Sequence, residues 1–578
     1  MAFQLSPGVS ITEKDVSLII PAVASTGGGI VSPFKWGPAE EVTLISSEKE
    51  LASVFGTPIN SPYGAQFWLS AANFLSYGNN LKVVRFVTAA DLNAAAGTAL
   101  AIKNSTAYKT ASLGNAAAWV AKYPGALGNS LKVVILDYYA GDPGNSDSLI
   151  SLDDYADHLD NFDAIPGTST FAVQQGNSSA KDEIHILVID EDGLFTGTKN
   201  TVLERFAFVS KAGNALKEDG TTNYYMNIIN NESQYIWFGN HTLALSTTGT
   251  AWGSDVPNTG SFKLLTGGGI DRVSLAGGAD TTFSSITHDT TIATTYDTYF
   301  GDADTVDVSL LIAGPLAVAA SNTVIQVAEA RKDCMAFVSP ILVVSSNTAA
   351  ANLTAATTFR SSLTASSYGV MDSGTKLQYD KYNDVYRYVP LCGDIAGCCV
   401  RTDLDKDPWY SPAGFDRGRI RNAIKLAYNP NKTHRDELYK KSINPVVQFD
   451  GSGVILFGDK TLLQKPSAFD RINVRRLFII LEKAIATAAK FLLFEFNDEF
   501  TRSQFGLLVE PFLRDVQGRR GITDFKVVCN ETNNTPQVID SNNFVADIYI
   551  KPTRSINFIQ LNFVATATGL SFEEVVGS

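Results

Sequence analysis

The segment GVILFGDKT, residues 453–461, resembles a phosphate-binding loop in its glycine spacing. In such a loop, lysine directly follows the second glycine, so that backbone amides and the lysine surround the phosphate. Here Asp459 stands before Lys460 and places a negative charge where the phosphate would lie. Pro466 also opposes the long helix that should follow at once. The segment is therefore predicted to be a turn after a strand.

The cysteines raise the question of a metal site or a disulfide framework. Their number, 5, is odd, and no secretory signal precedes them, which argues against a framework of disulfides. The cluster CGDIAGCC lacks paired CxxC spacing, and the closest histidine is His434. We predict buried or loop thiols in a reducing compartment, in preference to a metal site. The cysteines are Cys334, Cys392, Cys398, Cys399 and Cys529.

The histidines and paired acids give no recognisable catalytic pattern. No HExxH pair or evident Ser–His–Asp set is formed, although a fold can assemble a triad from distant residues. Paired acids such as Asp153-Asp154 and Glu573-Glu574 are typical of solvated faces. We predict that the chain is not an enzyme, with no catalytic, cofactor-binding or metal residues and no cofactor. The scattered histidines are His158, His185, His241, His288 and His434.

Size and composition indicate a multidomain globular protein. The chain has 578 residues, whereas a single core rarely grows beyond about 250–300 residues. Hydrophobic residues make up 45% and charged residues 18%, which is typical of globular proteins. The net charge of −13 disfavours general coating of nucleic acid, although a local basic patch is compatible with it. We therefore expect no direct nucleic-acid partner.

No targeting or membrane segment is recognisable. The first residues, MAFQLSPGVS, lack the charged and apolar regions of a secretory signal. Apolar runs such as Phe491–Phe494 are far shorter than the roughly 20 residues that span a bilayer. We expect a soluble protein that is made in a cytoplasm and does not insert into membranes.

The first half of the chain alternates predicted helices and strands. The pattern from Ser47 to Glu50 is a capping box for a helix that ends at Phe55-Gly56. A second apolar stripe ends near Gly78. The order strand, helix, strand over residues 306–338 predicts an α/β layer. The strands are predicted at Leu81–Val87, Lys132–Leu136, Ile184–Ile189, Val306–Ala313 and Met335–Val338, and the helix of the layer at Asn322–Ala330.

The second half is the most regular part. Val446–Phe449 and Val454–Phe457 are predicted to form a hairpin, and Thr433 is predicted to cap a short helix before it. Two long amphipathic helices follow, and Pro511 predicts a kink in the second. Strands are expected at Val545–Ile550 and after residue 558. The apolar positions of the two helices are Val474, Leu477, Phe478, Leu481, Ile485 and Ala488, then Phe505, Leu508, Val509, Phe512, Leu513 and Val516.

Short segments in one shared order make this chain resemble the sheath proteins of contractile bacteriophage tails. Each segment is weak alone, but their order extends over nearly the whole chain. In the first half they are Ser6-Pro7-Gly8-Val9, Phe55-Gly56, Tyr77-Gly78, Tyr123-Pro124-Gly125, Phe195-Thr196-Gly197 and Leu275-Ala276-Gly277-Gly278. In the second half they are Pro408-Trp409-Tyr410-Ser411-Pro412, Ile443-Asn444-Pro445, Lys460-Thr461-Leu462, Ile472-Asn473-Val474-Arg475-Arg476-Leu477 and Phe494-Glu495-Phe496-Asn497-Asp498.

The resemblance implies a multidomain α/β (α+β) fold. Its C-terminal α/β sheath core would carry extended strand arms at both chain ends, with outer mixed α/β and β-rich inserted domains. The implied division is an N-terminal arm at 1–20, a discontinuous middle domain at 21–97 and 183–384, a surface insertion at 98–182, the core at 385–565 and a C-terminal arm at 566–578.

The resemblance also implies a structural subunit of the virion, assembled in the host cytoplasm. It would form stacked hexameric rings around an inner tail tube and contract to drive the tube through the host envelope. Its partners would be further copies of itself, the tube protein, and baseplate and tail terminator proteins. The alternatives are the sheath of a related injection system, of the pyocin or type VI secretion type, or another virion structural protein.

The two chain ends are strand-patterned and remote from the amphipathic helices. Fraying is the ordinary fate of chain ends, but the resemblance favours strand exchange with neighbouring subunits. The second long helix is a candidate tube-facing element, and a solvated charged face is an equal alternative for it. The predicted exchange residues are Val9, Ile11, Ile559, Leu561, Phe563 and Phe572. The tube-facing candidates are Arg502, Arg514, Arg519 and Arg520.

Overall fold

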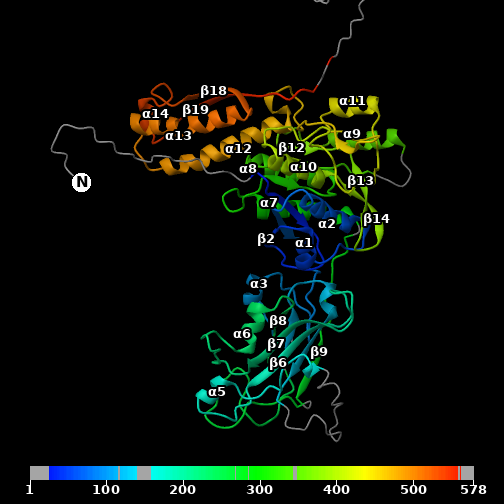
Figure 1. The fold of residues 1–578 in the computed structure, drawn as a ribbon, viewed down its shortest axis with the longest axis vertical. Helices are drawn as coiled ribbons and strands as arrows, with labels where there is room; N and C mark the ends of the chain where they lie inside the picture. Colours follow the sequence, from blue (N-terminus) through cyan, green and yellow to red (C-terminus); the bar gives the residue numbers. More distant parts are fainter. Residues whose placement is uncertain are drawn as a thin grey trace, which may run out of the picture.

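The computed structural model describes residues 25–114, 118–138, 158–241, 243–266, 269–283, 285–342, 348–557 and 560. Figure 1 shows an elongated molecule with a large upper part and a smaller lower part. We call the lower part, residues 92–279, the distal unit. The upper part consists of a central unit, residues 25–91 and 280–471, and a C-terminal unit, residues 472–557.

The central unit is built on a mixed six-stranded sheet of order β12-β11-β10-β1-β3-β2. All neighbouring strands are parallel except β2, which pairs antiparallel with β3 at one edge. The predicted strand–helix–strand layer is confirmed, since β10 and β11 are parallel neighbours joined through α8. The strands are β1 (Gly28–Ser32), β2 (Val42–Ile45), β3 (Leu81–Arg85), β10 (Leu310–Ile312), β11 (Met335–Val338) and β12 (Gly369–Met371).

Helices cover both faces of this sheet, so its strands are apolar on both sides. Ile30 packs in one core with α2 and α10, whereas its neighbour Val31 packs in the other core with α7 and α8. This opposition follows from the alternation of side chains along a strand. The helices are α1 (Glu48–Phe55), α2 (Pro62–Leu75), α7 (Asp289–Phe300), α8 (Val318–Arg331), α9 (Ala349–Ser361), α10 (Cys392–Asp405) and α11 (Lys432–Lys440).

Local capping agrees with the sequence at one helix and differs at another. Ser47 caps α1 by accepting a hydrogen bond from the Glu50 amide, as predicted. Helix α11 is capped by Asn431 through the His434 amide, so the predicted cap at Thr433 is wrong. Asparagine two residues earlier offers an equally good acceptor, and the helix therefore begins sooner.

Two small sheets complete the central unit. The predicted hairpin is confirmed as β16 (Val446–Phe449) paired antiparallel with β17 (Gly453–Leu456). The other sheet has the order β14-β13-β15. Its strands are β13 (Thr375–Asp380), β14 (Val385–Pro390) and β15 (Lys425–Leu426).

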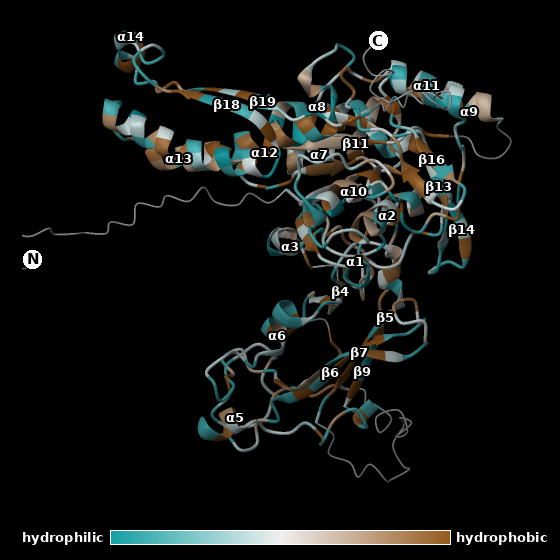
Figure 2. Cartoon of the chain, turned by 45° about the horizontal axis from the view of Figure 1, so that its top comes forward, coloured by the Kyte–Doolittle hydropathy of each residue, from teal (hydrophilic) through white to brown (hydrophobic). Residues whose placement is uncertain are grey.

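The distal unit contains an antiparallel sheet of order β7-β6-β5-β9 and a separate pair, β4 and β8. Figure 2 shows brown, hydrophobic strands at its centre. Strand β5 lies in the predicted insertion 98–182 but pairs with β6 and β9 beyond it, so a boundary at residue 182 runs through one sheet. The elements are α3 (Ser105–Thr110), β4 (Trp119–Ala121), β5 (Leu131–Leu136), α5 (Thr170–Gln174), β6 (Glu183–Asp190), β7 (Thr201–Ser210), α6 (Tyr225–Glu232), β8 (Ile236–Phe238) and β9 (Ile270–Ser274).

A buried arginine joins the distal and central units. Arg85, at the end of β3, donates to the carbonyls of Phe34 at 2.9 Å, Gly37 at 2.9 Å and Pro124 at 2.6 Å. Burial lowers the pKa of Arg85 to about 10, partly offset by nearby Asp280, so the guanidinium stays charged at neutral pH. These bonds satisfy carbonyls that would otherwise be buried without partners.

The C-terminal unit contains both predicted amphipathic helices, α12 (Ile472–Ala489) and α13 (Glu499–Gly518), followed by β18 (Ile522–Val528), α14 (Pro536–Asp540) and β19 (Asp547–Pro552). Helix α13 continues through Pro511. Pro511 and Leu507, whose carbonyl loses its usual donor, both lie on the exposed side of the helix, where water can replace that donor.

Candidate functional site

The two long helices of the C-terminal unit support a small sheet at the end of the chain. Leu477 and Leu481 of α12 pack with Phe505, Val509 and Leu513 of α13 in one buried core. Strands β18 and β19 lie against this core through partly buried side chains on one face of their sheet. The amphipathic pattern of the helices thus fixes the position of a sheet that could not be stable alone.

The β18–β19 sheet has two strands, which pair antiparallel from Ile522 with Pro552 to Val528 with Asp547. Within the described residues, neither strand pairs with a third strand at its outer edge. The backbone donors and acceptors along such edges are a template for added strands. Both outer edges of this sheet are therefore candidate sites for added strands.

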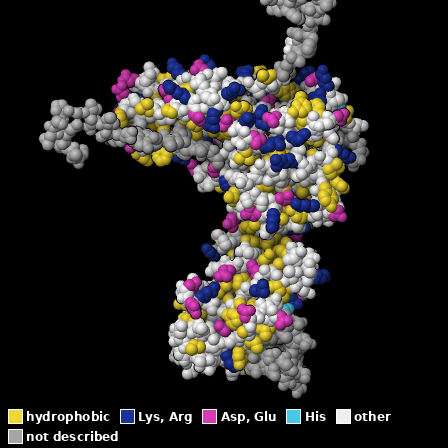
Figure 3. Space-filling model, viewed as in Figure 1, with side chains coloured by type: hydrophobic (Ala, Val, Ile, Leu, Met, Phe, Trp, Pro, Cys, Tyr) yellow, Lys and Arg dark blue, Asp and Glu magenta, His cyan; other side chains and the backbone are white. Residues whose placement is uncertain are grey.

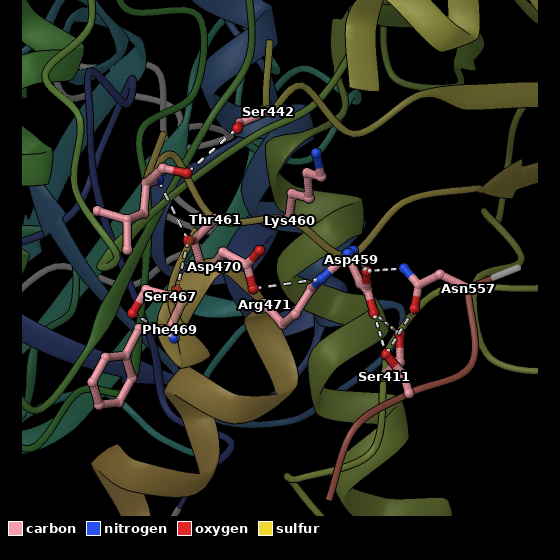
Figure 4. A network of polar contacts seen from close by, with 12 residues as sticks. Ser411, Ser442, Asp459, Lys460, Thr461, Ser467, Phe469, Asp470, Arg471 and Asn557 are labelled. Carbon is pink, nitrogen blue, oxygen red and sulfur yellow. Dashed lines mark hydrogen bonds and ion pairs between the residues drawn. The ribbon is translucent and has the colours of Figure 1, made fainter. Parts of the chain in front are cut away.

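The segment that leaves β19 is fastened to the central unit at Asp459. The Asp459 carboxylate accepts from the hydroxyls of Ser411 and Ser555, each at 3.1 Å, and pairs with Arg471 at 2.9 Å. The side-chain amide of Asn557 hydrogen-bonds to the Tyr439 hydroxyl at 2.8 Å. Figure 4 shows Ser411, Arg471 and Asn557 converging on Asp459.

Charge stabilises this attachment. Burial alone would lower the pKa of Arg471, but the Asp459 carboxylate and the Tyr439 hydroxyl together outweigh burial and raise that pKa. Burial and the same carboxylate raise the pKa of Tyr439, which keeps the hydroxyl protonated. The contacts therefore persist through neutral pH and fix where the chain leaves the unit toward residue 558.

The other exit, at the N-terminal side, is fastened to α10 and α12. Arg476 of α12 forms a buried ion pair with Asp403, with side chains 4% and 3% exposed. The Ser25 hydroxyl donates to Asp403 at 2.7 Å, and Arg476 donates to the Ser25 carbonyl at 3.4 Å. Burial alone would lower the pKa of Arg476, but Asp403 and the nearby Cys399 together outweigh burial and raise that pKa. Both exits are thus bound near the start of α12, through Arg471 and Arg476.

A groove of about 790 Å³ lies beside the C-terminal exit. Aromatic side chains line it together with basic ones, and the lining carries more positive than negative charge. The aromatic lining residues are Trp409, Tyr410, Tyr439 and Phe457, and the basic ones are Arg417, Lys432, Arg435, Arg520 and Arg554. A surface of this kind suits an apolar segment that carries acidic side chains.

The structure separates the predicted tube-facing arginines. Arg502 is 8% exposed and donates to Asn497, so it is held within its own turn at one end of α13. Arg514 is exposed and pairs with Glu510 at 3.4 Å. Arg519 and Arg520 follow the other end of the helix, about 26 Å from Arg502 at 1.5 Å per residue. The four arginines therefore form no single patch.

The predicted strand-exchange residues, Val9, Ile11, Ile559, Leu561, Phe563 and Phe572, lie outside the described residues. What the sequence analysis missed is the site that would receive such strands, because β18 was not predicted. Its alternation of Phe525 and Val527 with Asp524 and Lys526 is the signal that could have revealed it.

Comparisons with known proteins agree with this architecture. Residues 294–462 match the model of the phage tail sheath protein central domain, and residues 464–566 match that of the phage tail sheath C-terminal domain. The tail sheath protein of Vibrio phage KVP40 is 34% identical over 99% of this chain and 100% of its own. The chain belongs to the phage tail sheath family. The tail sheath protein of Enterobacteria phage T4 is 32% identical over 99% of both chains.

A solved sheath tail protein, Lin1278 of Listeria innocua, shares the fold with a TM-score of 0.54. It is 13% identical, and the match covers 93% of each chain. The resemblance inferred from the ordered segments and the multidomain α+β fold are both confirmed. The chain is accordingly a structural component of phage tails, as tail sheath proteins are.

The sheath family is structural, and the positions weighed for chemistry have structural roles here. In segment 453–461, Asp459 forms the ion pair with Arg471, and Thr461 donates to the Phe469 carbonyl at 2.9 Å. Cys392, Cys398 and Cys399 are buried in α10, where burial raises the pKa of each thiol to about 12. Such thiols are inert at neutral pH.

Among the residues placed by the structure, no three His, Cys, Asp or Glu side chains gather as metal ligands. In the same part of the chain, every helix is too short or too polar to cross a bilayer.

Proposed function

We propose that this sheath protein is the repeating subunit of a contractile tail. It polymerises as stacked hexameric rings around an inner tail tube, is linked by strand exchange, and contracts to drive the tube through the host envelope for genome delivery. The observation that carries the proposal is the β18–β19 sheet, whose two outer edges have no strand partner within the described residues. Two open edges match two chain ends that are strand-patterned.

The connection is heterologous, because the donor segments and the acceptor sheet are different surfaces of one chain. Head-to-tail contacts of this kind need not close, and they then generate helical filaments. The exits at Ser25 and Asn557 are bound to the rigid central unit. The segments beyond them can therefore act as linkers while the units rotate during contraction.

Contraction needs no nucleotide if the extended lattice is metastable. A gain of only about 1 kcal/mol per subunit, summed over many subunits, makes the transition effectively irreversible. The further partners are the tube, baseplate and tail terminator proteins, and assembly takes place in the host cytoplasm. Arg514, Arg519 and Arg520 remain tube-facing candidates because each is exposed. The alternative function is that of a sheath subunit in a related contractile injection system.

The test is assembly by truncated chains. Removal of residues 1–15, or of residues 566–578, should leave folded monomers that form no tubes in negative-stain micrographs, while the full chain forms striated hollow tubes. Circular dichroism of the monomers controls for folding. Normal tubes from either truncated chain would contradict strand exchange.

A further inference from the structure

The turn between α12 and α13 exposes an unusual number of large apolar side chains. We call residues 491–500 the aromatic turn. Phe494 and Phe496 are 104% and 82% exposed, and the other exposed members are Phe491 at 68%, Leu493 at 63% and Phe500 at 74%. Scattered exposed apolar residues are ordinary, but such a concentration marks an interaction surface.

The aromatic turn is also acidic, and hydrogen bonds hold one end of it. Glu495 and Glu499 are exposed, and neither has an ion-pair partner within the described part of the chain. Asp498 caps α13 by accepting a hydrogen bond from the Thr501 amide at 2.8 Å. Arg502 donates a hydrogen bond to the side-chain oxygen of Asn497 at 3.1 Å. Phe494 has a positive φ of 72°, a strained conformation for a bulky residue. The two hydrogen bonds hold the end of the turn where α13 begins, and the aromatic rings project into solvent from it.

The groove beside the C-terminal exit has the complementary character. Arg435 lies over the rings of Phe449 and Phe457 at 5.6 and 5.9 Å. Lys432, Arg520 and Arg554 are exposed, and no carboxylate within the described residues forms an ion pair with them or with Arg435. Figure 3 shows blue and magenta side chains interspersed over the upper part of the molecule, so a basic groove on this acidic chain is a local feature.

The aromatic turn and the groove cannot meet within one molecule. The aromatic turn ends at Phe500, in the first turn of α13, whereas Arg520 of the groove follows the end of α13 at Gly518. The helix between them, from Phe500 to Gly518, spans about 27 Å at 1.5 Å per residue. A contact between them must therefore join two copies.

We propose that the aromatic turn of one copy docks in the groove of a second copy, with Phe494 and Phe496 among its aromatic residues and Glu495 and Glu499 facing its basic ones. This contact rests on the proposed polymer and deepens it, because it is a second head-to-tail link that does not use the chain ends. It joins opposite ends of α13 in successive copies. The resulting row of contacts propagates in one direction.

The position of the turn can be tested by cross-linking in full-length tubes. A photo-cross-linking amino acid replaces Phe494, and the sites of cross-linking are mapped by mass spectrometry of tubes and of monomers. The expected result is intermolecular cross-links to the groove, at Tyr439 or Phe457, in tubes but not in monomers. Cross-links from the turn to another turn, or to any surface other than the groove, would overturn the inference. Cross-links of a groove probe at Tyr439 to residues 558–578 in tubes would also overturn it, since the groove would then hold a chain end.

Charge exchange tests the polarity of the contact. Glu495→Lys/Glu499→Lys in the turn and Lys432→Glu/Arg435→Glu in the groove should each raise the critical concentration for assembly about tenfold or more. The chain that carries all four substitutions should recover most of the loss. The matched control, Glu218→Lys/Asp255→Lys, reverses two exposed acids of the distal unit and should leave assembly unchanged. Thermal unfolding of each monomer controls for folding.

The outcomes separate this inference from the function on which it rests. Tubes that form at the same concentration in all variants would overturn the docking contact and leave the sheath proposal standing. A failure of the fourfold variant to recover, with both double variants folded and impaired, would overturn the direct pairing of turn and groove. A wild-type chain that stays monomeric at every concentration would overturn both.

Discussion

The buried ion pair between Asp403 and Arg476 offers a sharp test of how the N-terminal exit is held. Its two side chains are 3% and 4% exposed, and the guanidinium also donates to the Cys399 carbonyl at 3.4 Å. Asp403 is the only carboxylate paired with Arg476 among the described residues. Asp403→Asn therefore leaves a buried positive charge without its counterion.

The expected cost follows from this geometry. Removal of one partner of a buried pair costs about 3–5 kcal/mol, because the remaining charge has lost both water and counterion. Replacement of both partners by apolar residues of similar size, as in Asp403→Leu/Arg476→Met, removes both charges and should recover most of that loss. The double variant still lacks the two hydrogen bonds that hold Ser25. It should fold normally and yet form tubes poorly.

Hydrogen exchange is the suitable assay, because a multidomain chain does not unfold in one step. The opening free energy of α12 amides in the monomer should fall by about 3–5 kcal/mol in Asp403→Asn and by much less in the double variant. Micrographs then show whether tubes still form when the N-terminal exit is no longer held at Ser25. If α12 exchanges equally in the wild type and Asp403→Asn, the pair does not stabilise the helix. If the double variant assembles like the wild type, the hydrogen bonds to Ser25 do not guide assembly.

Three further predictions concern other buried charges. Burial raises the pKa of Asp372 to about 7. Between about pH 4 and 7 the native state therefore holds a proton that the unfolded chain has lost. As the pH rises through that window, the contribution of Asp372 to the free energy of unfolding falls by about 4 kcal/mol. Asp372→Asn should flatten this fall, measured as denaturation midpoints at pH 5 and pH 8; an unchanged difference would contradict the assignment. Arg85→Leu should leave several buried carbonyls without donors, at a cost of about 1–3 kcal/mol each. Hydrogen exchange should then become faster around residues 34–37 and 123–125. Amide protection equal to that of the wild type would show that Arg85 does not join the units. Asp459→Ala should remove the contacts that hold Ser555 and Arg471. Hydrogen exchange at residues 553–557 should become faster, and the tubes should be irregular in length. Asp450→Ala, on an exposed turn, serves as the control.

The sequence predicts those elements whose pattern is local. The stripe from Val474 to Ala488 and the hairpin around Asp450 emerge as α12 and β16–β17, because spacing along the chain alone specifies them. The parallel pairing of β10 with β11 follows from strand–helix–strand order. Such features can be predicted without knowing which distant residues pack against them.

Features that depend on distant partners could not be predicted. In the sequence, Asp459 only argues against a phosphate-binding loop. The fold alone shows its contact with Ser555, which is 96 residues away. Arg502 looked like an exposed helix residue, yet the turn before α13 folds over it. A charged side chain four residues past a helix cap has no local signal for burial, since its partner Asn497 lies in a turn without a regular period.

The distribution of satisfied and unsatisfied groups explains how one chain can be both rigid and incomplete. At the two exits, every charge that fixes the chain direction is paired inside the subunit, through Arg476 with Asp403 and Arg471 with Asp459. At the β18–β19 sheet, by contrast, the backbone edges lack strand partners among the described residues. Arg476 lies in α12 and Arg471 directly precedes it, and α12 also packs against the helix that supports the sheet. The directions of the two exits and the position of the sheet are therefore tied to one helix. A change in the orientation of α12 would therefore move both exits and the acceptor together, which is the coupling that a concerted rearrangement of a lattice requires.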